Sequence, residues 1–420
     1  MTHPRSDAPS APTPAPPRES LASWLGINRA MLAVLVLTAG LGLSEEIWRG
    51  FFGPYLKSIT RNLDMAAGLM GIFSCLVNLL EGFGYVIGGT VAHRMGARSA
   101  LLVSALPMAT GFGLLFASHE PWAIVIGALL ITNWEPLSVP ATFDIVGSEV
   151  PKERRTIAFA VQSIQKRLPR VVGPLVGGFV FLAAGYWLNL SLALAVLVLV
   201  MAIQWALMSR MKPKDDPAQV SWRKVLGDMP KDLRTLLTAE IFLRWGDWFV
   251  RDMASLYVVG VLLRSEKEWG FLLALTSFTA LLTYIPVGKW VDRAPSPKPY
   301  IGLTFFLFAL FPINLVLLPK SGLPAMAALS LVFIMNGLRE LGEPARKALI
   351  ASSFPKETRA RAVGLYWGLR SFAFCPAPLV AAFLWREIGP ETTFLLGGAI
   401  GLIGTAWFWL CVSCKPRTVA

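Results

Sequence analysis

Long apolar runs follow one another along almost the whole chain, and short polar gaps separate them. Each run is long enough to cross a bilayer as a helix, which takes about 20 residues. Lipid cannot satisfy backbone polar groups, and no run shows the alternation of barrel strands, so we expect helices. The sequence therefore predicts an all-α polytopic membrane protein with twelve transmembrane helices, near residues 30–54, 65–91, 98–117, 121–147, 157–183, 187–208, 237–263, 268–288, 299–318, 323–350, 361–385 and 391–413.

One stretch of the chain occurs twice. Residues 140–176 reappear as residues 344–380, shifted by 204 positions, and 11 of the 37 aligned positions are identical. A repeat of this length in so apolar a chain is typical of transporters built from two similar halves. We expect two pseudo-symmetric six-helix bundles.

A long polar stretch at 209–236 divides the predicted helices six and six. We expect a disordered cytoplasmic tail at 1–24, bundles at 25–208 and 237–414, a cytoplasmic linker at 209–236, and a C-terminal tail at 415–420. Residues 222–236 fit an amphipathic helix on the inner membrane surface and a solvated linker equally well.

Composition agrees with a membrane protein. Hydrophobic residues make up 55% of the chain and charged residues 15%, whereas soluble domains are about one quarter charged. The four cysteines lie in or beside predicted helices and are interpreted as apolar filler: Cys75, Cys375, Cys411 and Cys414. Residues 1–22 lack an apolar core, so we expect no cleavable signal peptide.

The net charge of +13 raises the question of nucleic-acid binding, but its distribution indicates topology instead. If the tails and even-numbered gaps face the cytoplasm, that side holds 25 basic residues and the opposite side six. This is a strong positive-inside bias. We therefore expect a multi-pass protein of the inner (plasma) membrane with both termini cytoplasmic, a lipid bilayer as partner and no nucleic acid.

Two loops carry a family resemblance. After the second predicted helix the chain reads GTVAHRMGAR at 89–98, which resembles the G-x-L-A-D-R-x-G-R-K loop signature of the major facilitator superfamily. GKWVDR at 288–293 is similar to its second-half counterpart. The resemblance covers residues 25–415 and implies that family's fold of two six-helix bundles. It also implies gating residues at Gly89, His93, Arg94, Gly96, Arg98, Gly288, Asp292 and Arg293.

In the family, the loop carboxylate holds the cytoplasmic ends of helices together near a helix N-terminus, where negative charge is favoured. Asp292 matches that pattern, but His93 stands where the first half should have a carboxylate. His93 is thus either a pH-sensing group or a tolerated surface substitution.

The fifth predicted helix contains Gly-Pro-Leu-Val-Gly-Gly at 173–178, similar to the G-P-x-x-G-G motif of exporters and antiporters in that superfamily. Glycines that only pack helices would give the same pattern. The helix-4 arginine motif of proton-driven drug exporters is missing, because the chain has Asn133-Trp134-Glu135 there.

Many charges fall inside the predicted spans, where an isolated charge costs several kcal/mol, so we expect them to face a wet cavity and to pair. The basic ones are Arg49, Lys166, Arg167, Arg170, Arg244, Arg251, Arg339 and Arg370, and the acidic ones Glu45, Glu46, Glu81, Glu135, Glu240, Asp247, Glu340 and Glu343. Aligning Tyr55 with Tyr257 places an acid and an arginine four residues apart in the first helix of both halves: Glu45 with Arg49, and Asp247 with Arg251.

These charges suggest roles. Basic or polar side chains would bind the solute: Arg170, Lys166, Gln162, Arg370, Arg339 and Arg251. Carboxylates in a wet cavity would carry protons: Glu45, Glu81, Asp247 and Glu135. A structural ion-pair network would contain Glu240, Arg244, Glu340, Glu343 and Arg49. For any single residue, a structural ion pair is an equally good interpretation.

The leading hypothesis is a monomeric secondary transporter that moves a small polar or amphipathic solute by alternating access, coupled to protons, with export by antiport favoured. A symporter importing an organic anion is the alternative, and a non-transporting receptor or scaffold belongs to another class. An enzyme is not expected, because the only histidines are His3, His93 and His119, in the tail and loops. No P-loop sequence occurs, and we expect no cofactor or metal.

Overall fold

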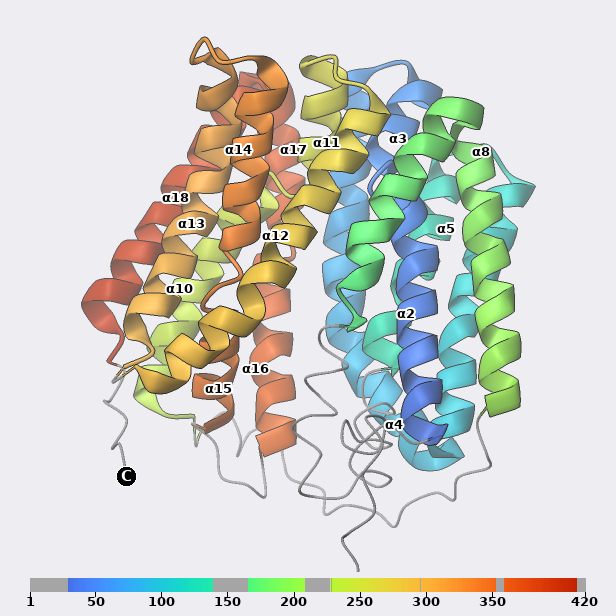
Figure 1. The fold of residues 1–420 in the computed structure, drawn as a ribbon, viewed down its shortest axis with the longest axis horizontal. Helices are drawn as coiled ribbons and strands as arrows, with labels where there is room; N and C mark the ends of the chain where they lie inside the picture. The colour runs from blue at the N-terminus through green and yellow to red at the C-terminus, as the bar shows by residue number, and fades with distance from the viewer. Residues whose placement is uncertain are drawn as a thin grey trace, which may run out of the picture.

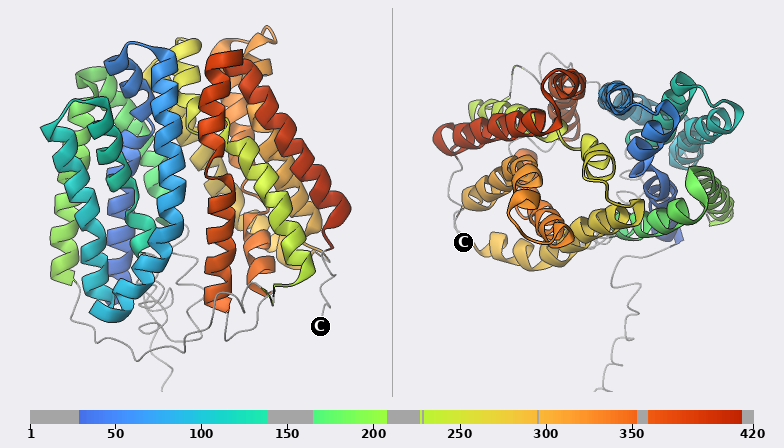
Figure 2. Two further views of the ribbon diagram at one scale, coloured as in Figure 1. Left: turned by 180° about the vertical axis from the view of Figure 1, so that it is seen from behind. Right: turned by 90° about the horizontal axis from the view of Figure 1, so that it is seen from above.

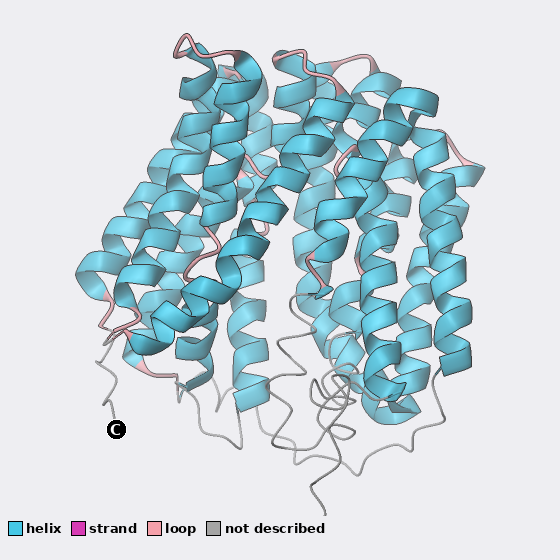
Figure 3. Ribbon diagram, in the orientation of Figure 1, coloured by secondary structure: helices cyan, strands magenta, loops and turns pink. Residues whose placement is uncertain are grey.

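A computed structural model describes residues 29–138, 165–207, 227, 229–294, 296–352 and 359–413. Every regular element within these residues is helical (Figure 3). This agrees with the all-α expectation, because a backbone placed in lipid must satisfy its hydrogen bonds within each helix.

The first part of the chain forms α2 (Arg29–Arg49), α3 (Phe52–Thr60), α4 (Leu63–Ala117), α5 (Pro121–Thr132) and α8 (Leu168–Leu207). The Asn62 side chain caps α4 by accepting a hydrogen bond from the Met65 N–H. Gly185 divides α8 into two helical segments with a φ of 76°, a left-handed conformation that favours glycine. The gap expected at 92–97 has helical backbone and lies inside α4.

The second part begins with α10 (Lys231–Trp248). It continues through α11 (Met253–Ser255), η2 (Leu256–Val261), α12 (Glu266–Arg293), α13 (Lys298–Leu317), η3 (Leu318–Lys320), α14 (Ala325–Leu338), α15 (Glu343–Ser352), α16 (Arg359–Phe374), α17 (Ala377–Ile388) and α18 (Pro390–Cys411). The break between α14 and α15 directly precedes Pro344, and the break between α16 and α17 includes Pro376. Proline removes a helical hydrogen bond and is tolerated near a helix start, which accounts for both breaks.

Five helical segments are long and apolar enough to cross a membrane: Leu63–Tyr85, Leu168–Ala206, Lys298–Lys320, Tyr366–Ile388 and Pro390–Cys411. Two shorter apolar helices are Leu101–Ala117 and Ala325–Leu338. The runs expected at 30–54, 237–263 and 323–350 are each divided into shorter helices. These three divided runs carry most of the charges that lie inside predicted spans.

The helices form two groups in space. Figures 1 and 2 show α2–α8, coloured blue to green, on one side and α10–α18, coloured yellow to red, on the other. We call them the N-terminal half and the C-terminal half. Large apolar side chains such as Leu410, Trp205 and Leu106 lie exposed, as expected for helices that face lipid.

Close backbone packing joins the two halves at one end. The Trp269 indole N–H of α12 donates to the Gly50 carbonyl oxygen at 2.6 Å. A methyl group added at Gly270 would clash with the Pro174 carbonyl oxygen of α8. Residues 61–62 and 262–265, which the charge distribution assigns to the outside, lie on helix-connecting turns next to these contacts. The halves therefore meet at the end assigned to the outside, and α4 also packs against α16 and α17 along its length.

Candidate functional site

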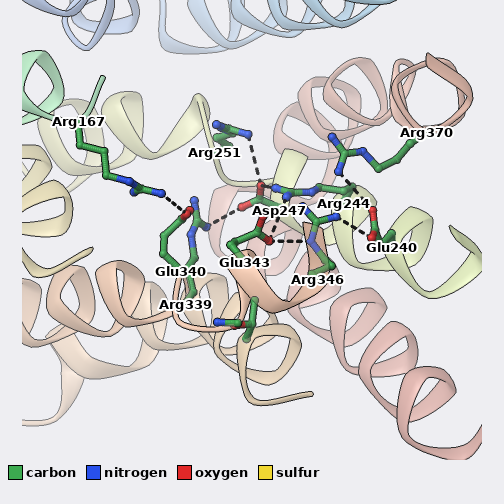
Figure 4. Close-up of polar contacts among 12 residues, drawn as sticks. Arg167, Glu240, Arg244, Asp247, Arg251, Arg339, Glu340, Glu343, Arg346 and Arg370 are labelled. Atoms are coloured by element: carbon green, nitrogen blue, oxygen red, sulfur yellow. Dashed lines mark hydrogen bonds and ion pairs between the residues drawn. The ribbon is translucent and has the colours of Figure 1, made fainter. Parts of the chain in front are cut away.

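A branched ion-pair network lies in the C-terminal half (Figure 4). Asp247 of α10 is 1% exposed and is its centre. Its carboxylate accepts contacts from Arg339 at 2.8 Å, Arg244 at 3.3 Å and Arg251 at 3.7 Å. Burying one carboxylate is costly unless it is paired, and here three guanidinium groups surround it. Arg244 and Arg339 also lie over the Phe308 ring, at 4.7 and 4.2 Å from its centroid.

The network continues through Arg346 of α15, which is 3% exposed. Arg346 contacts Glu240 at 2.6 Å and Glu343 at 2.6 Å, and Arg370 of α16 contacts Glu240 at 3.2 Å. Sequence analysis counted Arg346 among the inner-loop charges, so this member of the network was missed. The three-residue spacing of Glu343 and Arg346 within one helix was the signal that could have identified it.

The N-terminal half contains separate pairs instead of a network. Arg49 pairs with Glu45 four residues before it in α2, and the Trp134 indole N–H donates to Glu45 at 2.8 Å. Lys166 contacts Glu135 at 3.2 Å. The acid–arginine pair that the repeat predicts in both halves is thus present in both, as Glu45 with Arg49 and as Asp247 with Arg251.

Arg170 of α8 contacts Glu46 of α2 at 3.3 Å. Its side chain is 51% exposed, compared with 15% for Arg370 of the C-terminal half. Sequence analysis proposed both arginines as solute-binding groups because neither has an acid on its own helix turn. The structure gives each a carboxylate from another helix, but only Arg170 remains half exposed.

Glu81 of α4 differs from the other carboxylates proposed as proton carriers. It accepts a hydrogen bond from the Tyr85 hydroxyl at 3.3 Å and has no ion pair within the described residues. By contrast, each of the nine basic side chains described within the spans has a carboxylate within 4 Å: Arg49, Lys166, Arg167, Arg170, Arg244, Arg251, Arg339, Arg346 and Arg370. Within the described spans, carboxylates without an ion pair remain, Glu81 and Asp252 among them, and every basic side chain is paired.

An ion pair and a hydroxyl–carboxylate hydrogen bond also connect the halves. Arg167, which precedes α8, contacts Glu340 between α14 and α15 at 3.0 Å. The Ser74 hydroxyl of α4 donates to Asp252 at 2.5 Å. Sequence analysis assigned no role to Arg167, Ser74 or Asp252, because nothing in a linear pattern indicates which residues of the two halves come together.

The predicted gating residues fall on two helices. Gly89, His93, Arg94, Gly96 and Arg98 lie within the helical range of α4, and Gly288, Asp292 and Arg293 lie in the last turns of α12. Their side chains, and the whole of Gln162, fall outside the described part of the structure.

The glycines at 173–178 have packing roles. A methyl group at Gly177 would clash with the Ile47 carbonyl oxygen of α2, and one at Gly178 would come within 3.0 Å of the Glu266 carbonyl oxygen of α12. The glycines of this motif therefore allow α8 to pack closely against α2 of its own half and against α12 of the other half.

A groove of about 420 Å³ lies between α4 and α5, away from the ion pairs. Its walls include Ile87, Leu106, Pro107 and Leu130, and none of its lining residues is charged. No group of three metal-ligating side chains occurs among the described residues. The polar chemistry of the described chain thus lies in the ion pairs and Glu81.

Comparison with known proteins identifies the family. The model described as Major Facilitator Superfamily matches residues 30–265 and 249–419. The chain belongs to the major facilitator superfamily. This membrane transporter family is the one that the two loop signatures resemble.

Relatives of this superfamily member are named multidrug resistance proteins, and solved structures that share its fold are named transporters. The Multidrug resistance protein MdtH of Klebsiella pneumoniae is 26% identical over 376 residues, covering 86% of this chain and 90% of that protein. MdtH of Salmonella arizonae is 25% identical over 371 residues, covering 86% and 82%. A POT family transporter in complex with 5-aminolevulinic acid superposes with a TM-score of 0.74 at 15% identity, covering 91% of this chain and 96% of that chain. The likeness to that structure shows the shared fold.

Proposed function

We propose that this superfamily member is a proton-coupled exporter that moves small amphipathic solutes across the inner membrane in exchange for protons. In this proposal the chain crosses the membrane twelve times as two six-helix bundles, acts as a monomer, and has both termini in the cytoplasm. The observation that carries the proposal is the charge balance within the described spans. Glu81 has no ion pair there, while every basic side chain has one.

This balance favours protons and cationic solutes over anions. An anion site needs a cation that the protein does not already neutralise, and the described spans offer none. A carboxylate without a cationic partner inside the membrane is stabilised either by binding a proton or by binding a positively charged group. Glu81 can therefore take a proton and a cationic amphipathic solute in alternation, which is the requirement for antiport.

The surroundings of Glu81 suit such an exchange. The Tyr85 hydroxyl holds the carboxylate at 3.3 Å, and Tyr85 lies against Trp367 of the C-terminal half with 6.2 Å between ring centroids. Protonation of Glu81 thus changes charge next to a contact between the halves. Relatives named multidrug resistance proteins support the amphipathic solute class.

The contacts between the halves support alternating access. The Trp269–Gly50 hydrogen bond belongs to a state closed at the end assigned to the outside, and the Arg167–Glu340 ion pair joins the same two halves farther along the helices. Opening toward the outside requires these contacts to break. We assign Asp292 and the loop residues that match the signature to the opposing, cytoplasmic closure, by resemblance to the family.

Import of an organic anion is the second candidate, and Arg170 is the observation that favours it. Its guanidinium is half exposed and has a single carboxylate contact, to Glu46 at 3.3 Å. An incoming carboxylate can replace Glu46 at little cost, because exposed ion pairs are worth about 0–1 kcal/mol.

Proteoliposomes with an acidic lumen separate these functions. We expect ethidium, a cationic amphipathic dye, to accumulate in the lumen, and pyranine in the lumen to report proton loss when the dye is added. Nigericin, which collapses the pH gradient, should abolish the accumulation. Anion symport predicts instead that carboxyfluorescein enters when the outside is acidic. A receptor or scaffold predicts no flux of either dye and no proton movement, which would overturn the proposal.

A further inference from the structure

Two cysteines from opposite halves touch each other. Cys75 lies in α4 and Cys375 lies between α16 and α17, and their Sγ atoms are 3.3 Å apart. The Cys375 thiol also faces the Cys75 carbonyl oxygen at 3.3 Å. Both are free thiols, Cys75 half-buried and Cys375 buried. Sequence analysis treated all the cysteines as apolar filler, but filler does not require two thiols 300 residues apart to meet.

Close helix packing holds the two thiols together. Seven residues after Cys75, Gly82 faces the Phe372 ring, and a methyl group there would lie 3.0 Å from it. Four residues before Cys75, Gly71 faces the Pro378 carbonyl oxygen, and a methyl group there would lie 2.8 Å from it. The two backbones therefore approach on both sides of the cysteines. The thiols need only about 1.3 Å of further approach to reach the S–S bond length of about 2.05 Å.

We propose that Cys75 and Cys375 form an oxidation site, at which hydrogen peroxide creates a disulfide between the two halves. The half-buried Cys75 thiol reacts first, and its sulfur takes one oxygen of the peroxide to give a sulfenic acid, while the other oxygen leaves as water. The Cys375 sulfur then attacks the Cys75 sulfur, and the hydroxyl leaves with the thiol proton as a second water. Two thiols lose two electrons and two protons, and the peroxide is reduced to two waters.

The disulfide fixes the two halves in their present arrangement. The contact between α4 and the α16–α17 pair also contains the edge-to-face pair Phe83 and Phe372, with 5.4 Å between centroids. Alternating access, on which this part of the inference rests, requires the halves to move against each other at this contact. Oxidation thus stops transport, and reduction restores it.

A cleavage assay on the intact membrane protein tests the bond itself. A protease site is placed within residues 209–226, the full chain is oxidised in membranes with hydrogen peroxide, and free thiols are blocked with N-ethylmaleimide. After cleavage, a non-reducing gel should show the two halves still joined, and dithiothreitol should separate them. Cys75→Ser and Cys375→Ser should each abolish the link. The matched control, Cys411→Ser with Cys414→Ser, should retain it, because Cys411 is exposed at the end of α18.

If the halves separate after oxidation of the unaltered chain, or stay joined in Cys75→Ser, the proposed oxidation site is wrong. Ethidium flux tests the consequence: oxidation should lower it at least about fivefold, dithiothreitol should restore it, and Cys75→Ser should not respond. If the disulfide forms without lowering an existing flux, the proposal that oxidation stops transport is wrong. If the unoxidised protein carries no flux, the proposed transport function fails, while the gel still decides whether the cysteines bond.

Discussion

The two halves of this transporter contain the same acid–arginine pair and use it differently. Glu45 pairs with Arg49, and its other described polar contact is a hydrogen bond from the Trp134 indole N–H. Asp247 and Arg251 belong to a network in which Asp247 meets three arginines. The N-terminal half thus has separate pairs, and the C-terminal half has a largely buried network.

The repeat explains the difference. At the offset of 204 positions, Glu135 of the first half corresponds to Arg339 of the second. Arg339 contacts Asp247, whose charge is opposite, whereas Glu135 has the same charge as Glu45 and contacts Lys166. One change of sign therefore joins the pairs into a network in one half and keeps them separate in the other.

The largest effect should come from removing the centre of the C-terminal network. Asp247→Asn leaves the largely buried Arg244 and Arg339, together with Arg251, around a neutral amide, and breaking a buried pair in this way costs about 3–5 kcal/mol. The midpoint of thermal unfolding in detergent should fall strongly. The matched change in the other half, Glu45→Gln, should cost less, because it leaves one arginine that is 30% exposed. Equal losses for the two variants would contradict the difference between the halves.

Arg346→Met should also destabilise the protein by about 3–5 kcal/mol. It removes the cation shared by the buried Glu240 and Glu343 and leaves each carboxylate with a more distant arginine, Arg370 for Glu240 and Arg244 for Glu343. The thermal unfolding midpoint again provides the measurement. Arg386→Met is the control, because Arg386 is 74% exposed and should have no measurable effect. An unchanged midpoint for Arg346→Met would show that the network does not stabilise the fold.

The contact between the halves should have a smaller, conformational effect. We expect a double-mutant cycle of Arg167→Met and Glu340→Gln to give a coupling energy of about 0.5–3 kcal/mol in the equilibrium between the two access states. Cysteine accessibility to maleimides on the outer turns, in a background without native cysteines, would measure that equilibrium. Additive single effects would mean that the 3.0 Å contact does not hold the halves together.

The smallest effect is expected for Arg170→Gln. Arg170 makes a half-exposed pair, and such pairs contribute about 0–1 kcal/mol. Ethidium flux should therefore change by less than about fivefold, and stability should hardly change. A complete loss of carboxyfluorescein flux in this variant, with ethidium not transported by the unaltered chain, would support the anion symporter instead.

Features that follow from local periodicity could be predicted from the sequence. The apolar runs predicted the all-α class, and four-residue spacing predicted the Glu45–Arg49 and Asp247–Arg251 pairs. The twelve spans and the two six-helix bundles stay predictions. The relationships between the halves could not be predicted in this way. Arg167 with Glu340 and Cys75 with Cys375 meet only because helices of the two halves pack side by side. Arg346 was missed for a local reason, since the break at 339–342 begins a new helix and places it in the core.

The central claim is that Glu81, the described membrane carboxylate without an ion pair that faces Tyr85, carries the coupled proton. Its most direct test is ethidium accumulation by Glu81→Gln in proteoliposomes with an acidic lumen, compared with ethidium counterflow in the same vesicles without a pH gradient. We predict that gradient-driven accumulation falls at least about tenfold, the factor that corresponds to 1.4 kcal/mol, while counterflow and the unfolding midpoint stay unchanged. Full gradient-driven accumulation in this variant would contradict the account and place the proton elsewhere.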